Sequence, residues 1–352
     1  EIMNNVDDGI ETWGGTVNIK YFSIWNIGDD SFDVDQGWRG KAQKGLIVQG
    51  YSLDASQGSG VGDNAIEVDG AEDSDGQPVT TATIYNVTVI GQPLDGDGGT
   101  AWRDNARVQY RNMIFMDLGE RLVRFDGDDG DGSSGYGFNG TLSWADTWTT
   151  PFDNVPAHPN DCVQPGIYTA QSQGDASIGQ GFLAEITDSV FFRNLASDAY
   201  TESDARGVTV GGGSNPAKCN VVIPGFDAAD APIQELVRDV LEVKGGKDML
   251  RVLGINPLPQ NEALTSCASA PDDGFFMPCD YRGGFGPDEN WLCNWSTSDA
   301  FGFILGDCGP CPEPVECVED LSGDNQVNSD DLFILLGGWG PCVDCPGDFN
   351  GD

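Results

Sequence analysis

The clearest candidates for chemistry lie in the stretch DLSGDNQVNSDDLFILL, from Asp320 to Leu336. Oxygen-bearing residues recur there at alternate positions, so a tight loop can turn their oxygens toward one ion. Calcium is a hard cation that takes about six to eight oxygen ligands. The spacing predicts a calcium loop of the EF-hand type with these ligands: Asp320, Ser322, Asp324, the Gln326 carbonyl, Asn328 and Asp331.

Two residues of this loop depart from the usual pattern. Asn325 stands where Gly is common, and Asn can adopt the left-handed backbone that the position needs. Asp331 stands where Glu is common, which shortens the last ligand arm. The apolar run Leu332–Leu336 predicts a helix after the loop, ended by Gly337 and Gly338. An acidic turn without metal is the alternative interpretation.

A second copy of the loop starts near the end of the given sequence. Asp348, Asn350 and Asp352 match its first three ligand positions, and such a half-site binds calcium poorly unless other residues complete it. Cysteine pairs precede both copies, Cys311 and Cys317 before the first, Cys342 and Cys345 before the second. These cysteines suit disulfides in a secreted protein, with a zinc site as the alternative.

The loop resembles a type I dockerin repeat, because Asp331 closes it and a duplicated copy follows. The resemblance implies a calcium-folded tail that docks to another cell-surface protein or to a second copy of the chain. No further cofactor is expected.

The first 200 residues show an irregular internal repeat. Short acidic turns precede short strands in DDGIETWGG, GDDSFDVD, GDNAIEVDG and GERLVRFDG, which start at Asp7, Gly28, Gly62 and Gly119. Longer alternating strands follow, such as TVNIKYFSIWN and TATIYNVTVIGQ, at a spacing of about 20 to 35 residues that is typical of solenoids. The turns after strands carry Asn, which tolerates left-handed geometry and stacks between coils: Asn26, Asn86, Asn112 and Asn194. We therefore expect an all-β right-handed parallel β-helix rather than a β-sandwich.

The composition and the residue pattern change after residue 225. Pro232 to Glu242 (PIQELVRDVLE) predicts a helical insertion, and the Gly- and aromatic-rich residues that follow predict an irregular cap over one end of the β-helix. The expected organisation is β-helix coils over 1–225, helical insertion and cap over 226–306, and a Cys-rich linker with the calcium module over 307–352.

Composition limits the function classes. Only 17 Lys and Arg oppose 57 Asp and Glu, a formal charge of −40, which excludes nucleic acid and anionic membranes as partners. Such a chain repels itself unless cations neutralise it. All ten cysteines lie at or after Cys162, and with the acidity they indicate disulfides and a secreted, extracellular or cell-surface location. No apolar run is long enough to predict a membrane span.

The stretches DDGIETWGGTVNIKYFSIWNIGDDSFDVDQGWRGKAQ and DYRGGFGPDENWLCNWSTSDAFGF resemble a family of large secreted bacterial right-handed parallel β-helix proteins, often mislabelled as transporters. The resemblance covers most of residues 1–306 and implies no known reaction. It implies a β-helix in which many members end in dockerin-like or sorting segments.

Catalysis is the alternative to a structural role. A glycan hydrolase needs two carboxylates at a set separation, and a lyase needs a cation and a strong base. Both residue types occur in GDDSFDVDQGWRGK, namely Asp29, Asp30, Asp33, Asp35, Arg39 and Lys41. Asp at such turns is more often a turn former, so none of these residues is assigned a catalytic role.

Other candidates have simple structural explanations. His158, the one histidine, lies between prolines and has no G-x-S-x-G partner, so we interpret it as a loop residue. Acidic runs at 72–75, 95–97 and 126–131 can bind calcium, although a solvated loop is the favoured interpretation of each. Trp13, Trp25 and Trp38 can stack on sugars, with a core role as the alternative.

The sequence therefore predicts a non-catalytic, extracellular structural or adhesive protein that calcium stabilises. A first strand edge that starts inside a coil favours head-to-tail assembly into filaments. The alternative is a polysaccharide lyase or glycoside hydrolase that acts on acidic glycans at one β-helix face. A carbohydrate-binding module is a third option.

Overall fold

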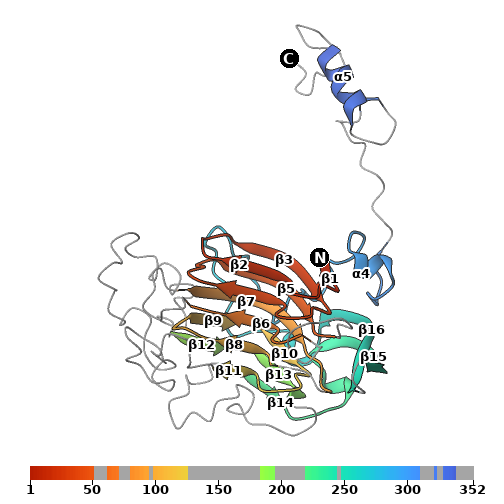
Figure 1. Cartoon of the computed structure of the whole chain (residues 1–352). Helices are drawn as coiled ribbons and strands as arrows, with labels where there is room; N and C mark the ends of the chain where they lie inside the picture. Colours follow the sequence, from red (N-terminus) through yellow and green to blue (C-terminus); the bar gives the residue numbers. More distant parts are fainter. Residues whose placement is uncertain are drawn as a thin grey trace, which may run out of the picture. The chain divides into compact units, whose positions relative to one another are not determined.

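The computed structural model describes residues 1–50, 62–70, 80–94, 98–125, 183–194, 219–243, 247–309, 321–322 and 328–337. The chain divides into two compact units, Glu1–Gly306 and Asp307–Asp352. In the first unit, successive passes of the chain add strands to two sheets in turn (Figure 1). Sheet A contains β1 (Ile2–Met3), β3 (Ile19–Trp25), β5 (Lys41–Val48), β7 (Thr81–Ile90), β9 (Arg107–Arg111), β10 (Ile114–Met116), β12 (Ala184–Thr187), β13 (Val190–Phe192) and β14 (Val221–Ile223).

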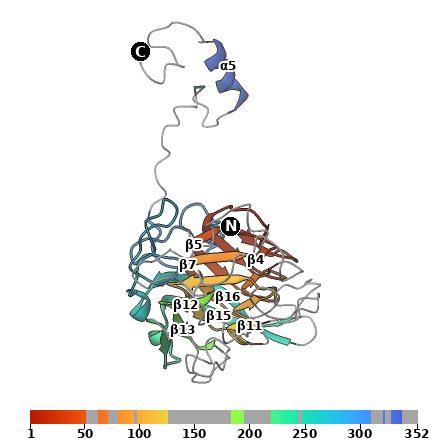
Figure 2. The same cartoon turned by 90° about the vertical axis from the view of Figure 1, so that its left-hand side faces the viewer.

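Sheet B contains β2 (Ile10–Trp13), β4 (Phe32–Asp35), β6 (Ile66–Val68), β8 (Thr100–Trp102) and β11 (Val123–Phe125). The strand pairs within both sheets are parallel. Parallel strands that alternate between two sheets along the chain form a parallel β-helix, which confirms the predicted class. Figure 2 shows the same stack turned by 90°.

The core lies between the sheets and follows from the period-two pattern of the strands. Phe32 and Val34 of β4 are fully buried, and they pair in register with the buried Ile66 and Val68 of β6. Aromatic rings also stack from coil to coil, as for Phe115 and Phe191 at 6.0 Å between ring centres. Each such side chain contributes roughly 1.5–3 kcal/mol through burial.

The repeat length varies more than the sequence pattern predicted. Asn4 and Asn26, on neighbouring coils, lie 22 residues apart, whereas Leu118 and Asn194 lie 76 apart. The strand register stays in phase across both intervals. The extra residues therefore leave the pairing of the described strands unchanged.

A column of residues with left-handed backbone bends sheet A where each coil turns. We call it the corner column, and its φ angles lie between 52° and 60°: Tyr21, Lys44, Asn86, Asn112, Asp188 and Cys219. Asn and Asp tolerate this geometry better than other side chains. The prediction for Asn26, Asn86 and Asn112 is confirmed, with φ of 53°, 52° and 55°.

Asn194 acts differently from the other predicted asparagines. It does not adopt the left-handed backbone among the residues described. Its side chain instead accepts a hydrogen bond from the Leu118 amide at 3.1 Å and donates to the Phe115 carbonyl at 3.2 Å. It thus ties one coil to the one before it.

Residues 265–284, the covering segment, lie on the outer face of sheet A along the corner column. Gln43 exchanges two 2.8 Å hydrogen bonds with the Met277 backbone, Asn86 donates to the Tyr281 carbonyl at 2.9 Å, and Asn112 donates to the Ala268 carbonyl at 3.0 Å. For residues 275–284 the predicted cap over one end is therefore wrong, because this segment bonds to successive coils along a lateral face.

Two features let the covering segment lie so close. Arg282, which is 4% exposed, donates to the backbone carbonyls of Cys219, Glu262, Thr265 and Asp188. A Cβ on Gly284 would lie 2.2 Å from the Gly45 carbonyl oxygen, so only glycine fits there.

The helix predicted over Pro232 to Glu242 is also wrong. Those residues belong to β15 (Ile233–Val243), which forms an antiparallel hairpin with β16 (Lys247–Pro259). Pairing along nearly the whole length of β15 overrides its helical pattern. Arg238 of β15 anchors the hairpin on the coils, through Asp117 at 2.6 Å and the Gly91 carbonyl at 2.7 Å.

Short helices complete the described chain. The 3₁₀ turns Ala228–Asp230 and Asn261–Ala263 and the helix α4 (Thr297–Ala300) belong to the first unit. In the second unit, α5 (Ser329–Gly337) confirms the helix predicted after the acidic loop. No described helix is long and apolar enough to cross a membrane.

Candidate functional site

The outer face of sheet B gathers the acidic side chains of the repeat. In register across β2, β4 and β6 lie Glu11, Asp33 and Glu67, and the same row continues to Arg124 on β11. Their strand neighbours point into the core, so alternation turns this row outward. We call the outward acids of β2, β4 and β6 and of the turns beside them the acidic face: Asp8, Glu11, Asp29, Asp30, Asp33, Asp35, Asp63, Glu67 and Asp69.

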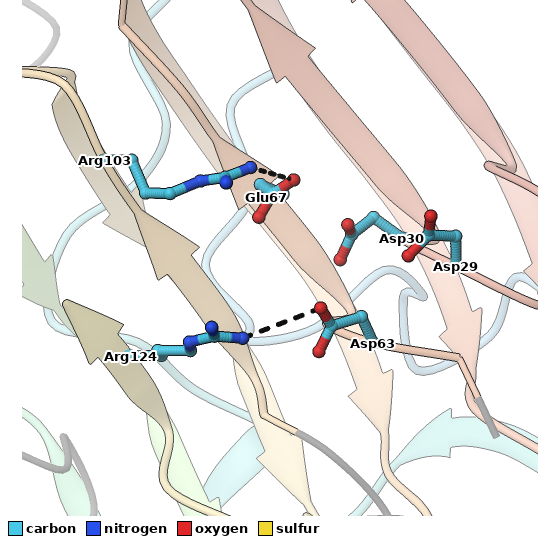
Figure 3. Close-up of a pocket in the computed structure, with 6 residues that line it drawn as sticks. All are labelled: Asp29, Asp30, Asp63, Glu67, Arg103 and Arg124. Carbon is cyan, nitrogen blue, oxygen red and sulfur yellow. Dashed lines mark ion pairs between the residues drawn. The ribbon is translucent and has the colours of Figure 1, made fainter. Parts of the chain in front are cut away.

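One end of the acidic face is hollowed into a pocket. Figure 3 shows its two arginines opposite its four acids. Arg103 pairs with Glu67 at 2.8 Å and with Asp69 at 2.6 Å, and Arg124 pairs with Asp63 at 3.6 Å. Six residues line this pocket: Asp29, Asp30, Asp63, Glu67, Arg103 and Arg124.

Two carboxyl groups in the pocket bond to each other. Asp30 is 4% exposed, accepts a hydrogen bond from the Asn64 amide at 2.6 Å, and is hydrogen-bonded to Glu67. Burial raises the pKa of both carboxyls. The charge of Asp30 and the shared bond raise the pKa of Glu67 further, whereas the bond from Glu67 lowers the pKa of Asp30. The pair therefore holds at least one proton near neutral pH.

Burial also raises the pKa of other acids on this face. The pKa of Asp29 and of Asp35 rises to about 6, and that of Asp33 to about 9. The pKa of Arg103 moves upward, because the attraction of Asp69 and Glu67 outweighs the effect of its burial. Arg103 consequently stays charged in this arrangement.

Three groups of carboxylates have oxygens close enough to share an ion. Within each group the oxygens lie within 4.8 Å of one another: Asp7, Asp8 and Asp29; Asp8, Glu11 and Asp33; Asp29, Asp30 and Asp63. Carboxylate oxygens are the ligands that calcium prefers.

The structure separates the residues of the GDDSFDVDQGWRGK segment. Asp29 and Asp30 line the pocket, whereas Lys41 pairs with Asp273 of the covering segment on the other sheet. Arg39 does not line the pocket either, and the cations there are Arg103 and Arg124. Sequence reasoning missed these arginines together with Asp63 and Glu67. The acid within each short strand, as in IETW, FDVD and IEV, was the available signal.

The described part of the predicted calcium loop is built around Asp331. Its carboxylate accepts hydrogen bonds from the backbone amides of Ser322 at 2.9 Å and Asn328 at 2.7 Å, which lower its pKa. Asn328 also accepts a bond from the Asp330 amide at 2.8 Å, at the start of α5. The other predicted ligands lie outside the described residues: Asp320, Asp324, Gln326, Asp348, Asn350 and Asp352.

The tryptophans differ in exposure. Trp25 and Trp38 are buried in or against the core, and Trp13 on β2 is 63% exposed. The indole of Trp13 donates to the carboxylate of Glu11. His158 and the acidic runs at 72–75, 95–97 and 126–131 lie outside the described residues.

The cysteines agree with an extracellular location. Cys219 and Cys267 form a disulfide that joins the corner column to the covering segment. Cys293 and Cys308 are also disulfide-bonded, and Cys279 is free and buried. Disulfides persist in oxidising compartments and so indicate an extracellular protein.

Comparison with known proteins agrees with the fold. A family model described as a pectate-lyase-like β-helix domain matches residues 1–177, just over half of the 352 residues. No curated protein and no solved structure matches the chain. The chain belongs to the family of pectate-lyase-like β-helix domains.

Proposed function

We propose that the chain is a non-catalytic structural or adhesive protein of the cell exterior, stabilised by calcium, with a tail that docks to a partner. The observation that carries this proposal is the bonding of the chain's own covering segment to the corner column, coil after coil. Such a body is stiff, because bending it would break hydrogen bonds and a disulfide together. Stiffness suits a scaffold.

The tail supports a calcium-dependent docking role. Ser322, Asn328 and Asp331, the described ligand positions of its loop, are already drawn together by two hydrogen bonds. Exposed apolar residues follow on α5, Leu332 at 50% and Phe333 at 67%. These three residues lie next to exposed apolar side chains, which fits a segment that binds another protein.

Self-assembly is the partner relationship that the sheets favour. Among the described strands, β14 of sheet A and β11 of sheet B each pair on one side only. A strand edge of this kind can accept a strand from another copy, and end-to-end contacts that do not close give filaments.

The test compares the full chain in calcium with the full chain in a chelator. We expect calcium to raise the melting temperature and order the tail, and Asp331→Asn to remove the tail effect. Asp330→Asn is the matched control, because the neighbouring Asp330 is not a predicted ligand. Equal melting curves and equal tail spectra in calcium and chelator would contradict the proposal. Electron microscopy of the same samples reports filaments.

A second function, cleavage of acidic glycans, is favoured by one observation. The Asp30 and Glu67 carboxyls share a hydrogen bond in a pocket that two arginines also line. The carboxyl pair can supply a general acid, and the arginines can attract a carboxylated sugar. Incubation with uronate polymers separates the two functions. Unsaturated or reducing products that disappear with Glu67→Gln would replace the structural proposal with an enzymatic one.

A further inference from the structure

We propose that Trp295, at the end of a stack of aromatic rings ahead of α4, is the contact surface of a binding site for neutral, β-linked pyranose glycans. The proposal names a ligand for the adhesive role, and in that respect it rests on the proposed function. It involves neither calcium nor the tail, so glycan binding can fail while the calcium effects persist.

Three aromatic rings stack one on another between the covering segment and α4. Phe285, which directly follows the covering segment and is 1% exposed, is the base of the stack. Its ring lies parallel to that of Trp291, with 4.9 Å between ring centres and 2° between planes. Trp291 in turn stacks on Trp295, at 6.5 Å and 22°. Stacking at these distances is favourable, so each ring holds the next in its orientation.

The outer face of Trp295 is the open end of this stack. One face of its indole lies on Trp291, yet 56% of the residue is exposed. The opposite face is therefore open to solvent. Phe301, at the end of α4, is 75% exposed and adds a second ring in water. Apolar surface of this kind, left in water and rimmed by polar residues, is characteristic of binding sites.

The stack is anchored to the fold, so its open face is rigid before any ligand binds. The Trp291 indole donates a 2.9 Å hydrogen bond to the Gly284 carbonyl, and Tyr21 of β3 packs edge-on against the same ring at 5.6 Å. Ser296, at the start of α4, is 3% exposed and donates to the Leu292 carbonyl at 2.7 Å. A preorganised surface loses less conformational entropy when it binds.

The charge around the stack disfavours anionic ligands. Residues 285–301 contain three acids, Asp288, Glu289 and Asp299, and no Lys or Arg. Lys44 pairs with Glu289 at 3.4 Å, but its side chain is only 4% exposed and is not presented to a ligand. Carboxylated sugars are therefore repelled, whereas the hydroxyl groups of a neutral sugar can donate to these carboxylates.

The geometry of the rings favours a sugar over a basic peptide. A cation is held best when rings flank it, as Tyr21 and Tyr281 flank the Lys44 ammonium at 5.4 and 5.7 Å. At Trp295 the rings are nearly parallel and present one flat face instead. A β-linked pyranose gathers its C–H groups on flat faces that pack on an indole, and its hydroxyls can reach polar neighbours such as the exposed Thr297.

Calorimetric titration of the full chain with cellohexaose and with N-acetylchitohexaose tests the site, and hexagalacturonate is the anionic comparison. We expect at least one neutral oligosaccharide to bind. Trp295→Ala should weaken that binding at least about tenfold, because Trp side chains often dominate a binding energy. Trp13→Ala is the matched control, since Trp13 is comparably exposed at 63% but lies on β2, and it should leave the affinity unchanged.

Hydroxyl-radical footprinting of the unaltered chain makes the test independent of how the variants fold. The bound neutral oligosaccharide should protect Trp295 from oxidation and leave Trp13 unprotected. Melting curves in calcium and in chelator, recorded on the same samples, report separately on the proposed function.

Three results would overturn the proposal: no binding of either neutral oligosaccharide, equal affinities of Trp295→Ala and Trp13→Ala, or equal protection of the two tryptophans. Hexagalacturonate binding that disappears with Trp295→Ala would contradict the neutral ligand class. A lysine-rich peptide that binds at Trp295 in place of the neutral sugars would replace the glycan with a protein partner.

Discussion

The outward polar side chains of sheets A and B have different kinds of neighbours. On sheet A, Gln43, Asn86 and Asn112 point outward, and the backbone of the covering segment satisfies each of them. On sheet B, Asp33 and Glu67 point outward in the same register, but their neighbours are mostly other acids. The covered face therefore uses polarity to hold the fold, whereas the acidic face keeps polarity that an ion or ligand can use.

Repulsion between like charges destabilises the acidic face. Stacked parallel strands bring equivalent side chains about 4.8 Å apart, so a repeated acid becomes a column of like charges. The corner column on the covered face mixes Asn86 and Asn112 with other residue types and so carries no row of like charges. Mutations should therefore damage the covered face most, and ionic conditions should affect the acidic face most.

Arg282→Met should give the largest loss. Arg282 is buried and donates hydrogen bonds to four backbone carbonyls. All four carbonyls would lose a charged donor. We expect at least about 3 kcal/mol of destabilisation in urea unfolding. Arg251→Met is the control, because the Arg251–Asp239 pair is surface-exposed and should contribute at most about 1 kcal/mol. Similar losses in the two variants would contradict the anchoring role of Arg282.

Removal of the Cys219–Cys267 disulfide should give the second-largest loss of stability. The bridge closes a separation of 48 residues and fastens the covering segment to the last position of the corner column. Replacement of both cysteines by Ser should cost about 2–4 kcal/mol, measured by urea unfolding without reductant. An unchanged unfolding midpoint would show that the covering segment is held without it.

Gly284→Ala should cost about 1–3 kcal/mol, because the new methyl group meets the Gly45 carbonyl at 2.2 Å. Gly286→Ala offers a close control, since the nearest atom to its new methyl group is a Tyr281 ring carbon at 3.4 Å. If the two variants melt at the same temperature, the covering segment does not lie as tightly on β5 as described here.

Acidification should give the smallest effect, and it should be stabilising. Burial raises the pKa of Asp29 to about 6, and the pKa values of Asp30 and Glu67 also rise. A carboxyl whose pKa is higher in the folded state stabilises the fold below its unfolded value of about 4 and loses this as pH rises. In chelator, the melting temperature should therefore rise by several degrees from pH 8 to pH 5. A fall over this interval would mean that the acidic face is not strained by its charge.

The sequence predicted the β-helix because the acidic turn and short strand recur, as in Asp7–Gly15 and Gly28–Asp35. It did not predict which face would be covered, because contacts such as Asn112 to Ala268 span 156 residues. The false helix arose because Ile233, Leu236, Val237, Val240 and Leu241 fit helical spacing. The Gly245-Gly246 pair between two β-rich runs was the overlooked hairpin signal.

The candidate site was visible only in part. The acids of GDDSFDVD were noted, but their partners Glu11 and Glu67 become neighbours through strand register, which uneven insertions hide in the sequence. Arg103, directly after β8, and Arg124 on β11 reach the pocket for the same reason. The tail loop was easier to propose from the sequence, because its predicted ligand positions follow one another along the chain.

Hydrogen exchange of the full chain, compared by region in calcium and in chelator, tests the contrast between the two faces most directly. We predict that calcium slows exchange in β2, β4 and residues 328–337 and leaves the covering segment unchanged, because the chain itself already secures that face. Equal exchange in β2 and β4 under both conditions, or a calcium effect confined to residues 265–284, would contradict the account.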